Sequence, residues 1–255
     1  MKKIKQGWLC SAALLLCSVS MTANAALINR GSGMIYDDVL DVTWLQDANY
    51  ARTTGYDFDG LMSWDQATTW ASNLTFGGYS DWRLPTLSPL NGSSFNVSFT
   101  FDDSSDRGYN TNPNFSELAH MFVNNLGNVA FFTTFGTGPQ AGSETFSSSF
   151  VDGSSGLSYS FQNILTSYWT DTNDDPFLNA VWAYNFRTNS GVATGEQVLA
   201  IDSAPFGAWA VRDGDVANTL SPPPDTSTDV SEPSALALLL MSGLGFAAAR
   251  KRAKN

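Results

Sequence analysis

The chain has 255 residues, of which 13 are basic and 24 acidic, with one histidine and two cysteines. Seven basic residues lie within the first five and last six positions, so the stretch between them holds six arginines, no lysine and all the acidic residues. Its net charge is therefore about −18, and so acidic a chain lacks the positive surface that binds phosphate backbones. Nucleic acid is excluded as a partner.

The cysteine and histidine counts narrow the chemistry further. Cys10 and Cys17 both lie in the first 25 residues, so the rest of the chain has no disulfide, thiolate zinc site or cysteine nucleophile. Any hydrolytic triad would have to use His120, whose neighbours resemble an amphipathic helix. We expect an ordinary histidine there, on the helix surface or half-buried. No catalytic residue is predicted, and we expect a protein that is not an enzyme.

Residues 1–25 have the three parts of a secretory signal peptide. A lysine-rich start precedes an apolar run from Trp8 to Val19, and Ala23-Asn24-Ala25 follows as a small-residue cleavage site. This order predicts passage through the secretory translocon and cleavage after Ala25.

The first half of the body predicts a hairpin and two helices. Met34–Tyr36 and Val42–Leu45 flank an aspartate-rich turn over residues 37–41. Ser63 and Gln66 have the capping-box spacing before a helix that ends at Gly77-Gly78. Ser116 can cap a second helix that runs through Leu126 to Gly127.

The second half predicts short strands between turns rich in Gly, Ser, Asn and Asp. The candidate strands are Val129–Thr134, Phe146–Phe150, Leu157–Phe161, Ser167–Thr170, Ala180–Phe186, Gln197–Ile201 and Ala208–Val211. Two early helices followed by a mostly antiparallel, loop-rich sheet region predict the α+β class.

Four segments carry a family resemblance. They are Thr43–Ala51, Gly78–Thr86 (which contains Trp82-Arg83-Leu84-Pro85-Thr86), Ser167–Thr172 and Ala208–Asp215. Together they resemble the Lcl C-terminal domain family, so we expect such a domain over residues 26–217. The Trp-Arg-Leu-Pro-Thr stretch is also similar to the formylglycine-generating-enzyme branch of C-type-lectin-like folds, whose oxidase cysteine is missing here. The resemblance implies a C-type-lectin-like extracellular domain, in a family where some relatives bind carbohydrate or glycosaminoglycan, and it transfers no catalytic residue.

The residues of these segments also have a structural interpretation. Seven tryptophans lie in or beside predicted elements, where large rings can fill a core that lacks disulfides. The alternative is that exposed tryptophans stack on sugars. Arg83 and Arg212 have apolar neighbours, so we expect each to pair with an interior aspartate.

An acidic loop is the candidate metal site. Asp171, Asp174 and Asp175 place three carboxylates within five residues, and hard oxygen ligands suit calcium. Aspartate also favours turns, so a solvated turn without a cofactor is the simpler interpretation. A secreted carbohydrate-active hydrolase that uses paired carboxylates is the alternative function, although the sequence nominates no pair.

The C-terminal region has three parts after a linker rich in Pro, Ser, Thr and Asp at residues 218–231. Val230, Glu232, Pro233 and Ser234 precede an uncharged, largely apolar stretch over 234–249, and a basic tail closes the chain. At ~1.5 Å per residue that stretch makes a short transmembrane helix, with the basic tail on the cytoplasmic side. Residues 232–255 resemble the PEP-CTERM sorting signal, with Ser231 in place of its first proline. The resemblance implies processing by an exosortase.

Taken together, these features predict an exported protein of the extracellular polysaccharide matrix. We expect a membrane intermediate anchored by residues 234–249, and then retention at the cell surface or in the matrix. The body is expected to bind carbohydrate or to play a structural part, with extracellular polysaccharide as its partner. The sequence nominates no ligand-binding residue.

Overall fold

The computed structural model describes residues 26–173 and 180–217. Its four-stranded sheet has the order β1 (Leu27–Gly31), β2 (Met34–Asp37), β3 (Val42–Leu45), β11 (Val211–Asp213), so the two ends of the described chain meet in one sheet. A five-stranded sheet has the order β4 (Phe99–Thr100), β5 (Arg107–Tyr109), β10 (Ala193–Ile201), β9 (Ala180–Arg187), β8 (Ser167–Trp169). β6 (Ser149–Val151) and β7 (Ser158–Ser160) form a separate hairpin.

Strand pairing is antiparallel throughout these sheets except between β4 and β5, which are parallel. The helices in the described residues are α1 (Tyr50–Thr53), α2 (Trp64–Asn73) and α3 (Glu117–His120), and α3 continues as the π-helix η1 (Met121–Asn125). Short helices with mostly antiparallel sheets place the fold in the α+β class.

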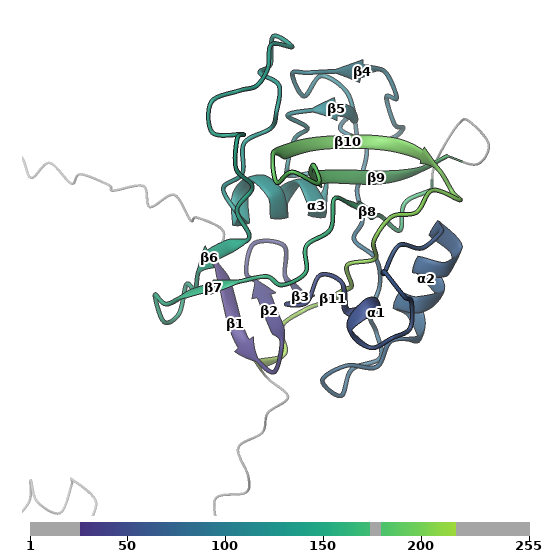
Figure 1. Cartoon of the computed structure of the whole chain (residues 1–255), viewed down its shortest axis with the longest axis vertical. Helices are drawn as coiled ribbons and strands as arrows, with labels where there is room; N and C mark the ends of the chain where they lie inside the picture. The colour runs from purple at the N-terminus through teal and green to yellow at the C-terminus, as the bar shows by residue number, and fades with distance from the viewer. Residues whose placement is uncertain (1–25, 174–179, 218–255) are drawn as a thin grey trace, which may run out of the picture. The chain divides into compact units, whose positions relative to one another are not determined.

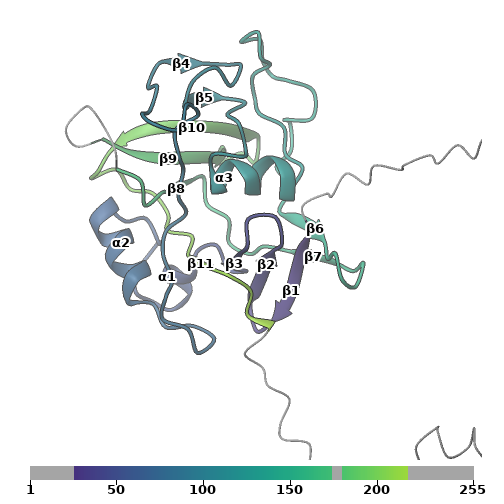
Figure 2. The ribbon, with the colours of Figure 1, turned by 180° about the vertical axis from the view of Figure 1, so that it is seen from behind.

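α3 and η1 join the two larger sheets. Figure 1 shows α3 between the five-stranded and four-stranded sheets, and the opposite view in Figure 2 shows the same order. The Phe122 ring lies 5.7 Å from the Tyr184 ring on β9, while the Asn125 amide donates to the Asp37 carboxylate on β2 over 2.6 Å. One helical segment therefore contacts both sheets and fixes their spacing.

Two predicted elements with strong local signals are confirmed. β2 and β3 form the expected hairpin, in which Ile35 pairs with Trp44. The Ser63 side chain accepts a hydrogen bond from the Gln66 backbone N–H, and the Gln66 side chain accepts one from the Ser63 backbone N–H. Both halves of the capping box thus start α2, which is the physical reason that the sequence located this helix. Its predicted end at Gly77-Gly78 is wrong, because the chain is already extended at Leu74, after the last helical residue Asn73.

The second predicted helix is confirmed, but its second half differs from an α-helix. The Ser116 hydroxyl caps α3 by accepting from the Ala119 N–H. From Met121 to Asn125 the backbone winds as a π-helix, whose wider turn places Asn125 toward Asp37. A π-helix carries no periodicity signal that separates it from an α-helix in the sequence.

The predicted strand at residues 129–134 is wrong, because its backbone bonds go to separate partners and form no ladder. The Phe131 N–H donates to the Thr194 carbonyl on β10 over 2.9 Å, and the Phe131 carbonyl accepts from the Gln140 N–H over 2.7 Å. The Phe132 carbonyl accepts from the Asn110 side-chain amide over 2.9 Å. The other predicted strands exist with shifted ends, most clearly β11, which begins at Val211 and not at Ala208.

Aromatic rings fill the core. The largest side chains with less than 2% exposure include Trp44, Trp169, Trp182, Trp209, Tyr168 and Tyr184. The Trp209 ring lies 5.0–5.8 Å from the rings of Trp44, Phe161, Tyr168 and Phe186, so it connects β3, β8 and β9. Rings of this size bury ~150–250 Å² each, which lets the described residues, none of which is a cysteine, build a sufficient core.

A buried carboxylate anchors the β6–β7 hairpin to β1. Asp152 is 2% exposed and accepts hydrogen bonds from the Asn29 N–H and from the backbone and hydroxyl groups of Ser154 and Ser155, over 2.5–3.0 Å. Burial by itself raises the pKa of the Asp152 carboxyl, but the hydrogen bonds outweigh it and hold the pKa well below its usual range. The ionised form is therefore part of the folded structure.

Asp152→Asn is expected to lower the free energy of unfolding at pH 7 by about 2 kcal/mol, because an amide accepts fewer of these bonds. A carboxyl whose pKa is lowered in the folded state stabilises the fold at pH values above its unfolded pKa of ~3.9. That stabilisation is lost as the pH falls from there through the folded pKa. The difference between the two proteins should therefore shrink below pH 4. Urea unfolding at pH 7, 5 and 3 measures it, with Asp202→Asn as the control. An equal difference at all three pH values would contradict the prediction.

Candidate functional site

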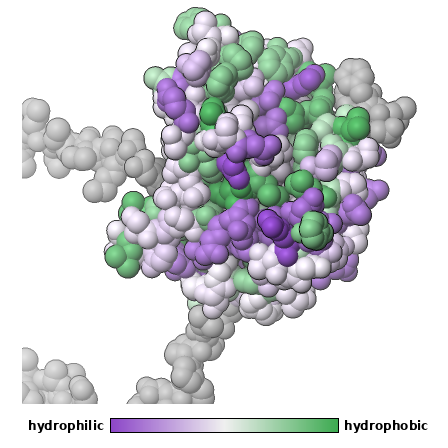
Figure 3. Space-filling view, in the orientation of Figure 1, coloured by the Kyte–Doolittle hydropathy of each residue, from purple (hydrophilic) through white to green (hydrophobic). Residues whose placement is uncertain are grey.

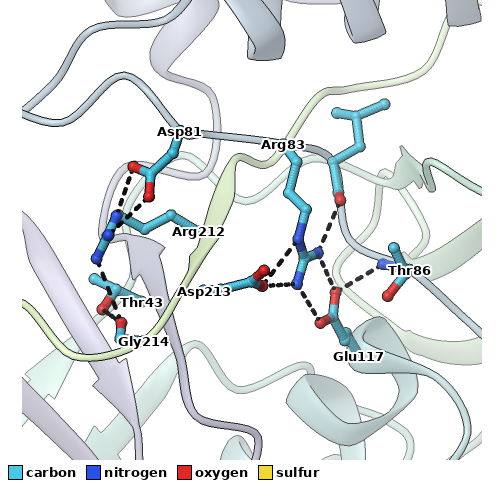
Figure 4. A network of polar contacts seen from close by, with 9 residues as sticks. Thr43, Asp81, Arg83, Thr86, Glu117, Arg212, Asp213 and Gly214 are labelled. Carbon is cyan, nitrogen blue, oxygen red and sulfur yellow. Dashed lines mark hydrogen bonds and ion pairs between the residues drawn. The ribbon is translucent and has the colours of Figure 1, made fainter.

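The Trp-Arg-Leu-Pro-Thr segment forms an ion-pair network (Figure 4). The Arg83 guanidinium makes two 2.8 Å hydrogen bonds to the Glu117 carboxylate on α3 and a 2.5 Å bond to Asp213 on β11. Glu117 also accepts from the Thr86 N–H over 2.7 Å. Burial by itself lowers the pKa of Arg83, but the two carboxylates outweigh it and raise the pKa above its ordinary value. The Arg83 guanidinium thus bonds carboxylates from two elements and connects β11 to α3.

Arg212 makes a second clamp beside the first. Its guanidinium donates to both carboxylate oxygens of Asp81 over 2.8–2.9 Å and lies 4.1 Å from the centre of the Tyr79 ring. The hydrogen bonds from Arg212 lower the pKa of the Asp81 carboxyl. The expected pairing of both arginines occurs, but not with interior aspartates: the Asp81 and Asp213 side chains are 58% and 79% exposed, and the more buried partner is Glu117.

The tryptophans of the body are structural, as the first of the two interpretations predicted. Six of the seven are less than 5% exposed: Trp44, Trp70, Trp82, Trp169, Trp182 and Trp209. The seventh, Trp64, is half-buried and donates its indole N–H to the Thr170 carbonyl. The alternative of exposed tryptophans as sugar-stacking surfaces is therefore wrong for the six buried ones.

Among residues 26–173 and 180–217, the exposed aromatic side chains are three phenylalanines and a tyrosine. Phe58 and Phe135 are 96% and 92% exposed, Tyr56 is 54% exposed and Phe99 is 44% exposed. On the face drawn in Figure 3, green hydrophobic residues occur in several separate places among pale and purple ones. That face therefore offers no single continuous apolar area.

His120 lies in the interior, with 2% of its surface exposed. Its Nε2 is 3.7 Å from an Asp37 carboxylate oxygen, and its Nδ1 is 3.0 Å from the Asn124 amide nitrogen. Burial lowers the pKa of His120, which favours the neutral ring. The expected helix position is confirmed, but the expected surface or half-buried setting is wrong, because the ring is buried beside Asp37.

A small pocket of about 240 Å³ lies where four separate parts of the chain meet. Its lining residues are Gly33, Leu45, Gln46, Asp47, Tyr50, Phe76 and Gln162. They come from the β1–β2 turn, the end of β3 with the start of α1, the segment after α2 and the segment after β7. Three amide or carboxylate side chains beside two aromatic rings make a surface that can bind a small polar ligand.

Asp47 is the charged group of this pocket. One of its oxygens accepts from the Asn49 N–H and the Asn163 amide over 3.0 and 2.9 Å, and the other accepts from the Thr53 hydroxyl over 2.6 Å. These bonds fix the orientation of the carboxylate. Asp47 and Tyr50 lie in the first segment of the family resemblance, a signal that could have nominated them, whereas nothing in the sequence marks Gln162.

A second pocket of about 90 Å³ lies beside α3 and includes Glu117, Thr86 and Pro113 in its lining. Glu117 is its one carboxylate, and it is already paired with Arg83. Neither this pocket nor the Asp47 pocket supplies the two facing carboxylates, ~5–10 Å apart, that glycoside hydrolysis uses. The hydrolase alternative stays a prediction without a site in these two pockets.

The acidic loop is only partly described. Asp171 donates its backbone N–H to the Pro85 carbonyl, while Asp174 and Asp175 lie outside the described residues. Desolvation raises the pKa of the Asp171 carboxyl, against the opposing influence of Arg83. Within residues 26–173 and 180–217, no three His, Cys, Asp or Glu side chains are close enough together to hold a metal ion. The calcium prediction depends on the two undescribed aspartates and is not tested.

The predicted sorting residues also lie outside the described parts of the chain. These are Ala23 and Ala25 of the cleavage site and Val230, Glu232, Pro233 and Ser234 of the C-terminal motif. The predicted membrane helix at 234–249 lies there as well. Among the helices that the structure describes, none is long and apolar enough to cross a membrane.

Comparisons with known proteins gave no match: no protein-family model, no curated protein and no solved structure is detectably similar to this chain.

Proposed function

We propose that this chain is an exported protein, retained at the cell surface or in the extracellular polysaccharide matrix, that binds carbohydrate or acts as a structural component there. The observation that carries the proposal is the three-part C-terminal signal, in which the motif at 230–234 precedes the apolar stretch 234–249 and a basic tail. Residues 1–25 support export through the secretory translocon, and the C-terminal signal supports later processing by an exosortase.

For residues 26–217 we propose an Lcl C-terminal-like domain with a C-type-lectin-like fold. The four resembling segments support it, and the α+β arrangement is compatible with it. Two of these segments, Gly78–Thr86 and Ala208–Asp215, are joined by the clamps of Arg83 and Arg212. Arg83 and Arg212 thus stabilise one part of the fold. The residues that carry the resemblance in these two segments therefore have a structural role.

A binding role draws support from the Asp47 pocket and from the charge of the chain. The pocket combines hydrogen-bonding side chains with aromatic rings, the mixture that orients small polar ligands. The excess of acidic side chains keeps an exported protein soluble and disfavours adhesion to nucleic acid.

Fractionation of a culture tests this function. The full chain is expressed in a bacterium that has an exosortase and makes extracellular polysaccharide. We expect mature protein that begins at Ala26 and co-purifies with the polysaccharide fraction. Glu232→Ala and Pro233→Ala should leave export intact and accumulate a membrane-bound form with an unprocessed C-terminus, whereas Thr226→Ala in the linker should behave as the wild type.

Three outcomes would contradict the proposal. Mature protein that still begins at Met1 would exclude the signal peptide. Unchanged processing in both motif variants would exclude the sorting signal. Processed protein recovered entirely free of polysaccharide would exclude the matrix role.

A further inference from the structure

The Asp47 pocket is built on a rigid backbone junction. The Gln46 N–H donates to the Gly33 carbonyl over 2.8 Å, the Gln162 N–H donates to the Gln46 carbonyl over 2.8 Å, and the Ala48 N–H donates to the Gln162 carbonyl over 2.9 Å. The β1–β2 turn, the end of β3 and the segment after β7 are therefore held together by main-chain bonds. Such a junction positions side chains before any ligand arrives.

The polar side chains of the pocket have hydrogen-bond donors and acceptors that no protein group in the described residues uses. A carboxylate offers about four acceptor positions, and Asp47 uses three of them within the protein. The Gln46 amide nitrogen donates to the Ser160 carbonyl, which leaves its amide oxygen available. Among the described residues, the Gln162 amide and the Tyr50 hydroxyl make no side-chain hydrogen bond. Donors and acceptors thus face the same small space, as a ligand with several hydroxyl groups requires.

One wall of the pocket is aromatic. The Tyr50 and Phe76 rings meet edge to face with centres 5.0 Å apart, and Phe76 is backed by the buried Trp82 ring at 5.9 Å. Gly33 has φ +81°, and a β-carbon there would lie 3.2 Å from the Phe76 ring, so the glycine allows the ring to lie against the turn. An aromatic wall beside amides suits a ligand with one apolar C–H face and a polar rim.

The size and charge of the pocket limit which ligands it can bind. About 240 Å³ is the space of roughly eight water molecules at ~30 Å³ each, which is close to one sugar ring and below the ~300–1,000 Å³ of sites for larger ligands. The lining includes the Asp47 carboxylate and no lysine, arginine or histidine. A uronate or sulfated sugar would bring a second negative charge beside Asp47 with no cation to offset it.

From these four features we infer that the Asp47 pocket binds a single neutral hexopyranose ring, presented at the end of a glycan or as a branch. This inference rests on the carbohydrate-binding form of the proposed function and names its site and its class of sugar. The pyranose C–H face contacts Tyr50 and Phe76, and its hydroxyls exchange hydrogen bonds with Asp47 and Gln162. Acidic glycans are excluded from this pocket.

The test uses the purified full-length chain with defined probes. A glycan array first reports whether any carbohydrate binds. NMR titrations then measure the Kd of the methyl glycosides of glucose, galactose and mannose against glucuronate and galacturonate. We expect at least one neutral glycoside to bind and both uronates to bind at least tenfold more weakly.

Variants locate the site. Gln162→Ala removes an exposed side chain with no hydrogen bond to lose, and it should raise the Kd of the preferred glycoside at least tenfold with an unchanged melting temperature. Gln162→Glu should weaken binding further through its added charge. Asn173→Ala removes an exposed amide that is not in the lining and should bind as the wild type.

The possible failures are distinguishable. If the array shows no carbohydrate binding at all, the binding part of the proposed function fails, and the pocket inference fails with it. If carbohydrate binds and both Gln162 variants bind as the wild type, the proposed function stands and this pocket is the wrong site. If uronates bind more tightly than neutral glycosides, the class of ligand is wrong.

Discussion

Trp209→Ala is expected to lower the free energy of unfolding by about 4 kcal/mol, which is a large fraction of the ~5–15 kcal/mol that stabilises a typical domain. The Trp209 side chain is fully buried and contacts four other aromatic rings. Its removal leaves a cavity between β3, β8 and β9 that these large rings cannot fill without leaving their own contacts. The indole N–H also donates to the Leu45 carbonyl over 2.8 Å, and that buried acceptor would lose its partner.

Urea unfolding monitored by circular dichroism measures this change. Trp209→Phe keeps a ring and should retain part of the stability. Phe58→Ala is the matched control, because that ring is 96% exposed and its loss should change the free energy of unfolding by less than ~0.5 kcal/mol. A loss below ~1.5 kcal/mol in Trp209→Ala would show that the ring cluster is not central to the core.

Features coded by neighbouring residues were predictable from the sequence. The capping box of Ser63 and Gln66 defines the start of α2 within four residues, and the alternation around residues 37–41 defines the β2–β3 hairpin. Both signals act through bonds between near neighbours, so no knowledge of the rest of the fold is needed.

Features that depend on distant partners were not predictable. The segment 129–134 has strand-like composition, but its backbone bonds go to separate partners, at Thr194 on β10, at Gln140 and at the Asn110 side chain, and not along one neighbouring strand. β4 and β5 are only two and three residues long, too short to produce a periodic pattern. In each case a tertiary contact decides the local structure, and the local pattern contains no information about that contact.

The candidate site shows the same limit. Asp47 and Gln162 are far apart in the chain and meet through a parallel bridge between their backbones. Gly33 and Phe76 join them from two further segments. Asp171, Asp174 and Asp175 form a recognisable candidate because they are close together in the chain. The pocket, by contrast, is assembled by the fold from single residues of separate segments.

The second large effect on stability is expected at Arg83. Arg83→Met should lower the free energy of unfolding by about 2–3 kcal/mol, below the ~3–5 kcal/mol for breaking a fully buried pair, because the Arg83 side chain is 24% exposed. Methionine keeps much of the side-chain volume. It leaves the Glu117 carboxylate, which is 14% exposed, without the guanidinium that donates two hydrogen bonds to it. Urea unfolding at pH 7 measures the loss.

Four further variants separate the ion pair from packing. Arg83→Lys keeps the charge but cannot form the paired bonds to Glu117, so its stability should fall between those of the wild type and Arg83→Met. The double variant Arg83→Met/Glu117→Met removes both charges and should recover stability relative to Arg83→Met alone. Arg52→Met is the control, since that exposed arginine makes no side-chain hydrogen bond or ion pair among the described residues. The single variant Glu117→Met gives the loss of stability for that side chain alone. If adding Glu117→Met to Arg83→Met caused the same loss again, the two side chains would be acting independently. The ion pair between them would then not be the source of the segment's stability.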